Sequence, residues 1–140
     1  MKVCHVINTL NRGGAETHLL ELIKEQKNKG YDIDLIVIGP DSPNVISLQS
    51  NFINLCTSIK RLNGPRMFNP ISYGRLYKLI NKNEYNIIHS HQPRSDFMIY
   101  FIKKFLKNFK WIVSVHGKYD TYLENTNFSN SVKKKLMSSL

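Results

Sequence analysis

The sequence predicts an α/β domain built on one parallel β-sheet with helices on both faces. Short apolar runs alternate along the chain with segments in which apolar residues recur at helical spacing. Polar and glycine residues end these runs, and 41% of the residues are hydrophobic, which is enough for a packed core. At 140 residues the chain has the size of one domain. Alternating strands and helices favour right-handed crossovers, and therefore parallel strands.

The first strand and helix are predicted on either side of a pair of glycines. Residues 2–8 (KVCHVIN) form a short segment rich in β-branched residues, which is typical of a buried strand. From Ala15 onward the apolar residues recur at helical spacing, and Gly30 stands where a C-cap is expected. The order is therefore strand, glycine turn and helix.

Two further strands are expected in the next part of the chain. Residues 33–38 form a continuous apolar run that Gly39 and Pro40 end. Residues 52–56 follow a polar loop and are a weaker candidate strand.

The remaining elements repeat the alternation. Pro70 can open a helix, and residues 86–91 (NIIHSH) indicate a strand. A helix is expected over 95–108 and a last strand over 111–115. We expect the domain to cover residues 1–120, and residues 121–140 to form a polar loop and the start of a basic helix.

Charge and composition restrict the class of partner. The formal charge of +10 favours nucleic acid, an acidic lipid surface or a phosphorylated small molecule, but no nucleic-acid motif accompanies the charge. Phenylalanines alternate with lysines over residues 97–110, which is compatible with peripheral contact with an anionic membrane. No apolar run resembles a signal peptide or a membrane span, so a cytoplasmic location is expected. Cys4 and Cys56 are expected to be reduced thiols.

The candidate functional residues follow the predicted strands. In an open parallel sheet, ligands bind beyond the carboxyl ends of the strands, near the point where the strand order reverses. The residues expected at that edge are Gly13, Gly14, His89, His91, Gln92, Pro93, Arg94, His116 and Gly117. His5 lies inside a strand and His18 inside a helix, so both are expected to be packing or surface residues.

The glycine pair, Gly13 and Gly14, has two interpretations. Glycines let a backbone approach a ligand closely, and the free amides at a helix start can face an anion. Alternatively, a tight turn at this point requires a positive φ angle. The pair does not fit G-x-G-x-x-G, so a nicotinamide cofactor is disfavoured.

No metal site is expected. His89 and His91 would share one face of a strand and could bind a metal together with His116, but no carboxylate or cysteine is placed to join them. Hydrogen bonding and packing are the favoured roles of these histidines. Asp32 and Asp34 spell D-x-D, yet they begin a strand at the opposite edge and are interpreted as solvated charges.

Three segments together resemble a known family: VCHVINTLNRGGAETHLLELI, NIIHSHQPRSDFM and WIVSVHGKYD. In this order they resemble the N-terminal, acceptor-side domain of GT-B fold glycosyltransferases of family 4, the group 1 class. The resemblance covers about residues 1–120 and implies a Rossmann-like domain. It also implies a retaining enzyme that moves a sugar from a nucleotide-sugar donor to a lipid-linked or saccharide acceptor in cell-surface polysaccharide synthesis, without a metal or other cofactor.

The resemblance also assigns roles to individual residues. Gly13 and Gly14 would form the glycine loop beside the donor diphosphate and the acceptor hydroxyl, with Gly14 in a catalytic role. His116 would contact the transferred sugar as the second catalytic residue, and Gly117 would lie beside it. The residues expected along the acceptor cleft are His91, Arg94 and Asp96.

One feature of the family is not found in this sequence. The family holds its nucleotide in a second domain with an E-x7-E motif, and no two glutamates here have that spacing. We therefore expect the 140-residue chain by itself to be inactive. The alternative is a non-catalytic module that binds a phosphorylated ligand or an anionic surface.

Overall fold

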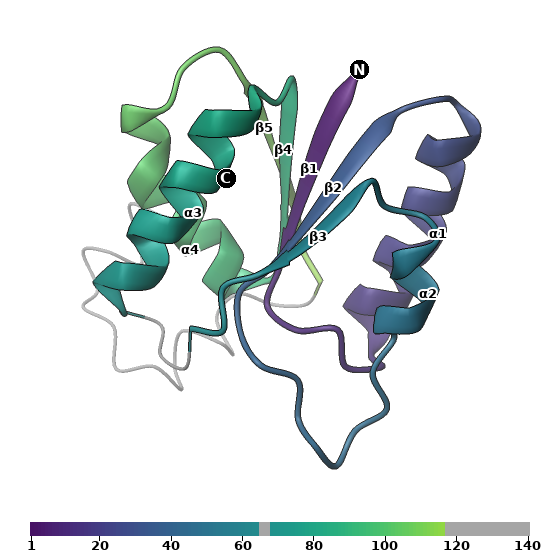
Figure 1. Cartoon of the computed structure of the whole chain (residues 1–140). Helices are drawn as coiled ribbons and strands as arrows, with labels where there is room; N and C mark the ends of the chain where they lie inside the picture. The colour runs from purple at the N-terminus through teal and green to yellow at the C-terminus, as the bar shows by residue number, and fades with distance from the viewer. Residues whose placement is uncertain (65–67, 117–140) are drawn as a thin grey trace.

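A computed structural model describes residues 1–64 and 68–116 and has three layers, with one sheet between two layers of helices (Figure 1). The elements in chain order are β1 (Lys2–Ile7), α1 (Gly14–Asn28), β2 (Asp32–Val37), α2 (Gln49–Ile53), β3 (Ser58–Arg61), α3 (Pro70–Asn83), β4 (Ile87–His91), α4 (Pro93–Ile102), the 3₁₀ helix η1 (Lys103–Phe105) and β5 (Lys110–Ser114). The five strands are all parallel and lie in the order β3-β2-β1-β4-β5. The predicted fold class is confirmed.

The strand order reverses beside β1. The chain builds outward from β1 to β2 and β3, and then returns through α3 to place β4 on the other side of β1. In the two ladders, Ile7 pairs with both Val37 and His91. The carboxyl ends of β1 and β4 therefore flank the switch point of the sheet, where open α/β sheets bind ligands.

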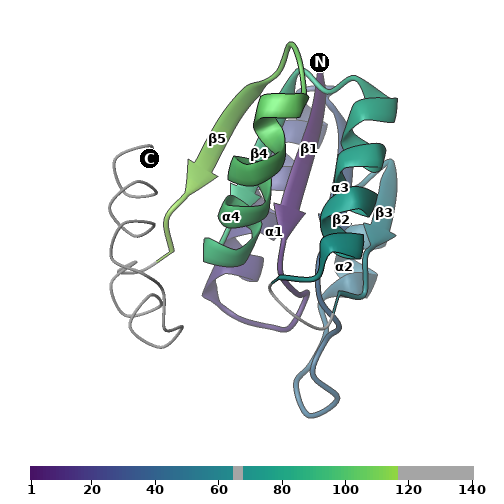
Figure 2. The same ribbon diagram turned by 90° about the vertical axis from the view of Figure 1, so that its left-hand side faces the viewer.

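Alternate residues of the strands fill two separate cores. One core includes Val6, Ile36 and Ile88 and packs under α3 and α4. The other includes Ile7 and Leu35 and packs under α1 and α2. Figure 2 shows α3 and α4 in front of the sheet and α1 behind it. Because both faces are covered, the central strands read as continuous apolar runs in the sequence.

Two predicted elements were wrong in type or extent. Residues 52–56 do not form a strand, because helix α2 ends there with Phe52 fully buried, and the strand is β3. β3 lies at the sheet edge and is only partly buried, so it carries no apolar run that the sequence could reveal. The helix expected over 95–108 starts earlier, at Pro93, and ends at Ile102. Asn108, with φ of 61°, has a left-handed backbone that a helix does not accommodate.

The helix ends agree better with expectation. Gly30 has a φ of 77° directly after the C-cap of α1, which is the conformation that favours glycine there. Pro70 opens α3, and the Asn69 side chain accepts a hydrogen bond from the Ile71 amide at 3.0 Å.

The D-x-D pair lies at the amino edge of the sheet as predicted, but Asp34 is not solvated. Asp32 is exposed, whereas Asp34 is buried and accepts hydrogen bonds from Ser58 Oγ at 2.6 Å and from the Tyr85 hydroxyl at 2.7 Å. Lys2 Nζ lies 3.8 Å from Asp34. The carboxylate is therefore a structural part of the amino edge of the sheet.

Both cysteines are free thiols, as expected. Burial raises the pKa of the Cys56 thiol to about 12 and that of Cys4 further, so neither is a thiolate near neutral pH. No helix within residues 1–64 and 68–116 is both long and apolar enough to cross a bilayer.

Candidate functional site

The candidate site lies where the strands end at the switch point. Gly13 and Gly14 follow β1 and start α1, Gln92 follows β4, and His116 stands two residues after β5. Asn8, the first residue after β1, lies between these segments, because its amide bonds the Gln92 side chain. The predicted convergence of these loops on one sheet edge follows from the parallel topology.

The two glycines have different structural explanations, and neither has a positive φ angle. Gly13 is extended, with φ of −154° and ψ of −179°, so the interpretation that the turn requires a left-handed residue was wrong. A Cβ on Gly13 would lie 2.7 Å from Glu16 Oε2, so the glycine accommodates this carboxylate. A Cβ on Gly14 would meet no described atom within 4 Å. The contacts of the described residues therefore explain the glycine at position 13 but not the one at 14.

The first turn of α1 offers backbone donors at this edge. Gly13 is the N-cap and has no side chain to cap the helix, and Gly14 is exposed. The first amides of a helix have no partner within the helix, and the helix dipole makes them attractive to negative charge. The start of α1 can therefore hold an anionic group.

Gln92 connects the ends of β1 and β4 with the first turn of α1. Its Oε1 accepts a hydrogen bond from the Asn8 amide at 3.2 Å, and its Nε2 donates to Glu16 Oε1 at 2.9 Å. Its backbone has φ of 84° and ψ of 150°, a region nearly reserved for glycine that costs about 1–3 kcal/mol for other residues. Sequence reasoning placed Gln92 at this edge but gave it no role, because nothing in the sequence marks a strained glutamine.

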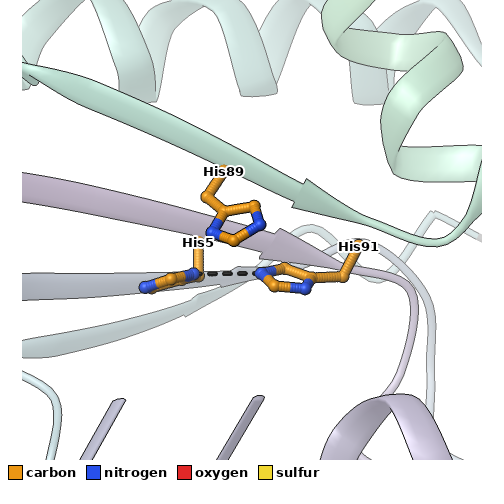
Figure 3. Close-up of side chains that lie close together, drawn as sticks. All are labelled: His5, His89 and His91. Atoms are coloured by element: carbon orange, nitrogen blue, oxygen red, sulfur yellow. Dashed lines mark hydrogen bonds between the residues drawn. The ribbon is translucent and has the colours of Figure 1, made fainter. Parts of the chain in front are cut away.

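Three histidines form a buried cluster on the α1 side of the sheet (Figure 3). His5 Nδ1 lies 3.0 Å from His91 Nε2, and the rings of His89 and His91 have centroids 4.1 Å apart. The other nitrogen of His5 bonds Gln26 Oε1 at 2.7 Å, and His89 Nε2 bonds Ser114 Oγ at 2.7 Å. His5 is a packing residue as predicted, but its bond to His91 connects it to the functional edge.

Burial keeps this cluster uncharged. Desolvation lowers the pKa of His5 and of His89 to about 4, and it lowers the pKa of His91 further still. The side chains that bond the cluster from α1 and β5, Gln26 and Ser114, are also uncharged. All three imidazoles are therefore neutral near pH 7.

Neutral imidazoles are also the usual ligands of zinc, and one ligand atom from each of the three lies within 4.8 Å of the others. The trio that the topology brings together contains His5, not His116 as the sequence suggested. Two of the six ring nitrogens bond each other, two more bond Gln26 and Ser114, and no acidic residue or cysteine within the described ranges completes the group. Hydrogen bonding and packing account for the cluster.

His116 continues the histidine cluster toward the surface. Its ring stacks on His91 with centroids 5.8 Å apart and meets the edge of His18 at 5.3 Å. His18 is an exposed surface residue of α1, as predicted, but its contact with His116 brings it to this sheet edge, which the sequence did not indicate. Burial and the neighbouring His18 lower the pKa of His116, and Glu16 opposes that shift.

Three buried polar atoms at this edge have no hydrogen-bond partner among the described residues: Asn8 Oδ1, His91 Nδ1 and His116 Nε2. They belong to the ends of β1, β4 and β5. An unpaired buried polar atom costs about 1–3 kcal/mol, so native structures contain few of them. Three such atoms among the described residues gather at this one sheet edge.

The remaining predicted site residues lie beside this group. Arg94 Nη2 donates to the Gly64 carbonyl at 2.6 Å, and burial lowers the pKa of the guanidinium. Asp96 is fully buried in the first turn of α4. Gly117 lies outside the described residues. The roles in ligand binding assigned to all three remain predictions.

The comparisons with known proteins agree with this architecture. Residues 12–140 match the family model described as Glycosyltransferase Family 4. No curated protein matches the sequence.

Solved structures show the same fold. Sucrose-phosphate synthase from Thermosynechococcus elongatus superposes with a TM-score of 0.64 at 15% identity, and the match covers 99% of this chain and 40% of that protein. Two structures of the C-terminal domain of a hydrogenase from Pyrococcus furiosus give TM-scores of 0.57 and 0.59 at 11% and 14% identity, covering 81% of this chain and 90% of theirs. At these identities the matches establish the fold alone.

Proposed function

This chain belongs to glycosyltransferase family 4, and on that premise we propose that it supplies the acceptor-side wall of a sugar-transfer site. The reaction would move a sugar, with retention of configuration, from a nucleotide-sugar donor to a lipid-linked or saccharide acceptor in cell-surface polysaccharide synthesis. The chain spans 40% of the sucrose-phosphate synthase structure that it resembles. The activity of the whole protein is accordingly part of the proposal.

The observation that supports this proposal is the group of buried polar atoms at the switch point that have no hydrogen-bond partner within residues 1–64 and 68–116. Asn8 Oδ1, His91 Nδ1 and His116 Nε2 gather where β1, β4 and β5 end. A sugar presents several hydroxyl groups, each of which can donate and accept a hydrogen bond. Such a ligand can satisfy an amide oxygen and two imidazole nitrogens at once.

Gly14 and His116 have the catalytic roles in this proposal. With no described atom within 4 Å of a Cβ at Gly14, a substrate can approach the first amides of α1 closely. Those amides would hold the negative charge that grows on the leaving diphosphate. His116, uncharged because burial lowers its pKa, would hydrogen-bond the transferred sugar through Nε2.

Gly13, His91, Arg94, Asp96 and Gly117 would contribute to donor or acceptor binding. His91 Nδ1 is buried at the end of β4 and has no partner in the part of the chain that the structure describes, which supports a polar contact there. Neutral side chains and amides suffice for this binding, so we propose no metal or other cofactor. The competing proposal is a non-catalytic module in which the same edge holds a phosphorylated ligand.

We also propose a cytoplasmic location with peripheral contact at the inner face of the cell membrane. Phe101 is 42% exposed and Phe105 is 64% exposed, beside Lys103 and Lys104. The Lys103 ammonium lies 4.6 Å from the centre of the Trp111 ring. Exposed aromatic rings beside lysines suit the surface of an anionic bilayer.

The test is nucleotide-sugar turnover by the complete protein that carries this domain, comparing His116→Ala with the parent. Loss of one hydrogen bond to the reacting sugar should lower kcat about 100-fold. Asn81→Ala is the control, because Asn81 is exposed in the last turn of α3, which leads into the amino end of β4. Turnover within twofold of the parent for His116→Ala, with a folded protein, would overturn the catalytic role.

A further inference from the structure

The side chain of Gln92 spans the switch point of the sheet. The ladder between β1 and β4 ends at the pair Ile7 and His91, and Gln92 Oε1 then accepts the hydrogen bond of the Asn8 amide. The amide nitrogen of the same side chain donates to Glu16. A carboxamide has one accepting end and one donating end, so a glutamine can bond a backbone N–H and a carboxylate together. A glutamate at this position could not donate to Glu16.

The backbone of Gln92 explains why the side chain matters. Its φ of 84° and ψ of 150° suit glycine, and the strained carbonyl is held by Ser95 Oγ at 2.8 Å and by the Asp96 amide at 3.1 Å. A glycine would adopt this backbone without strain but would lose both side-chain bonds. Strain of this kind persists where the surroundings enforce it, and it clusters at functional sites.

Glu16 lies between Gln92 and the glycine pair, Gly13 and Gly14. One carboxylate oxygen of Glu16 accepts a hydrogen bond from Gln92, and the other lies 2.7 Å from the position that a Cβ on Gly13 would take. Glu16 is 5% exposed, so little water competes for these contacts. The contacts therefore run without interruption from Gln92 through Glu16 to Gly13 and the first turn of α1.

We propose that Gln92 is a positioning residue of the transfer site, which fixes Gly13 and Gly14 against the end of β4 by holding the Glu16 carboxylate. This role rests on the proposed function, because there the start of α1 receives the donor diphosphate. Gln92 itself need not touch a substrate. Its contribution is to keep the donating amides of α1 at a constant distance from β4.

A charge swap tests this role in the 140-residue chain without any substrate. The variants are Gln92→Glu, Glu16→Gln and the double variant, and urea unfolding is measured in parallel. The readout is amide hydrogen exchange by NMR at Thr17, whose N–H donates to the Gly13 carbonyl at 3.0 Å and so reports on the position of Gly13. Gln92→Glu sets two carboxylates against each other, and exchange of the Thr17 amide should rise at least 10-fold. The double variant restores an amide facing a carboxylate, so exchange should return to within threefold of the parent.

The matched control is Gln49→Glu, the same substitution at a glutamine that accepts hydrogen bonds from Arg61. It should leave exchange of the Thr17 amide unchanged. Unchanged exchange in Gln92→Glu, or a double variant as perturbed as that single variant, would overturn the positioning role. If Gln92→Glu loses its global fold, the double variant alone decides, through rescue or its absence. Because no sugar is involved, either result is independent of whether the protein transfers one.

Discussion

Acidification should destabilise this domain through its buried histidines. His5, His89 and His91 are neutral in the folded state, and burial holds the pKa of the first two near 4, with that of His91 lower still. In the unfolded chain a histidine has a pKa of about 6.5, so below that pH the unfolded state binds more protons than the folded state. The stability from each neutral imidazole is complete above pH 6.5 and is lost as the pH falls toward the folded-state pKa.

The magnitude follows from that difference. Each buried imidazole lowers the free energy of unfolding by about 1.4 kcal/mol for every pH unit below 6.5, or roughly 2 kcal/mol at pH 5. Three such groups sum to about 4–6 kcal/mol, which is comparable with the whole stability of a small domain. No carboxylate is bonded to the cluster within the described ranges, so no ion pair offsets the loss.

Urea unfolding of the chain at several values between pH 7.5 and 5 measures this dependence. His91→Asn should reduce the slope of unfolding free energy against pH by about a third, whatever it costs at pH 7.5. Asn81→Ala changes an exposed side chain that does not titrate and should leave the slope unchanged. A parent protein of constant stability between pH 6.5 and 5 would falsify this account of the cluster.

Three further predictions concern stability, and urea unfolding at pH 7.5 measures each. Gly13→Ala should lower the free energy of unfolding by about 1–2 kcal/mol, because its Cβ would displace the Glu16 carboxylate. Gly14→Ala should leave the free energy of unfolding unchanged or raise it slightly, since alanine is favoured in a helix. Equal losses for the two variants would contradict the different explanations given for the two glycines. Tyr85→Phe should cost about 1–3 kcal/mol by removing the hydroxyl that bonds Asp34, and no cost would mean that Asp34 is solvated. Phe52→Ala should cost about 3–5 kcal/mol, since the ring is fully buried, and a cost below 1 kcal/mol would contradict that packing.

The fold could be predicted from the sequence because its signals are local. The central strands are covered on both faces and appear as apolar runs. Helix α1 ends just before the predicted Gly30, and α3 begins at the predicted Pro70. β3 could not be found in this way, because an edge strand that is only partly buried needs few apolar residues. Parallel topology then brought Gly14 and His116 to one edge, as the sequence order suggested.

The parts of the candidate site that sequence reasoning missed depend on contacts between distant residues. The bond between His5 and His91 joins residues from neighbouring strands, and the one between Gln92 and Glu16 crosses from β4 to α1. Side-chain direction on a strand can be predicted from alternation, but a particular hydrogen-bond partner cannot. The strained backbone of Gln92 could not be predicted either. Its conformation favours glycine, and the sequence has a glutamine at that position.

The central claim is that position 14 is a glycine because a substrate must approach the backbone there, and not because the fold requires one. Nucleotide-sugar turnover by the complete protein carrying Gly14→Val tests it most directly. Gly74→Val, at an exposed and equally open position within α3, serves as the control. The account predicts that Gly14→Val loses at least 100-fold in turnover while its unfolding free energy stays within about 1 kcal/mol of the control. Turnover equal to that of Gly74→Val would contradict the claim.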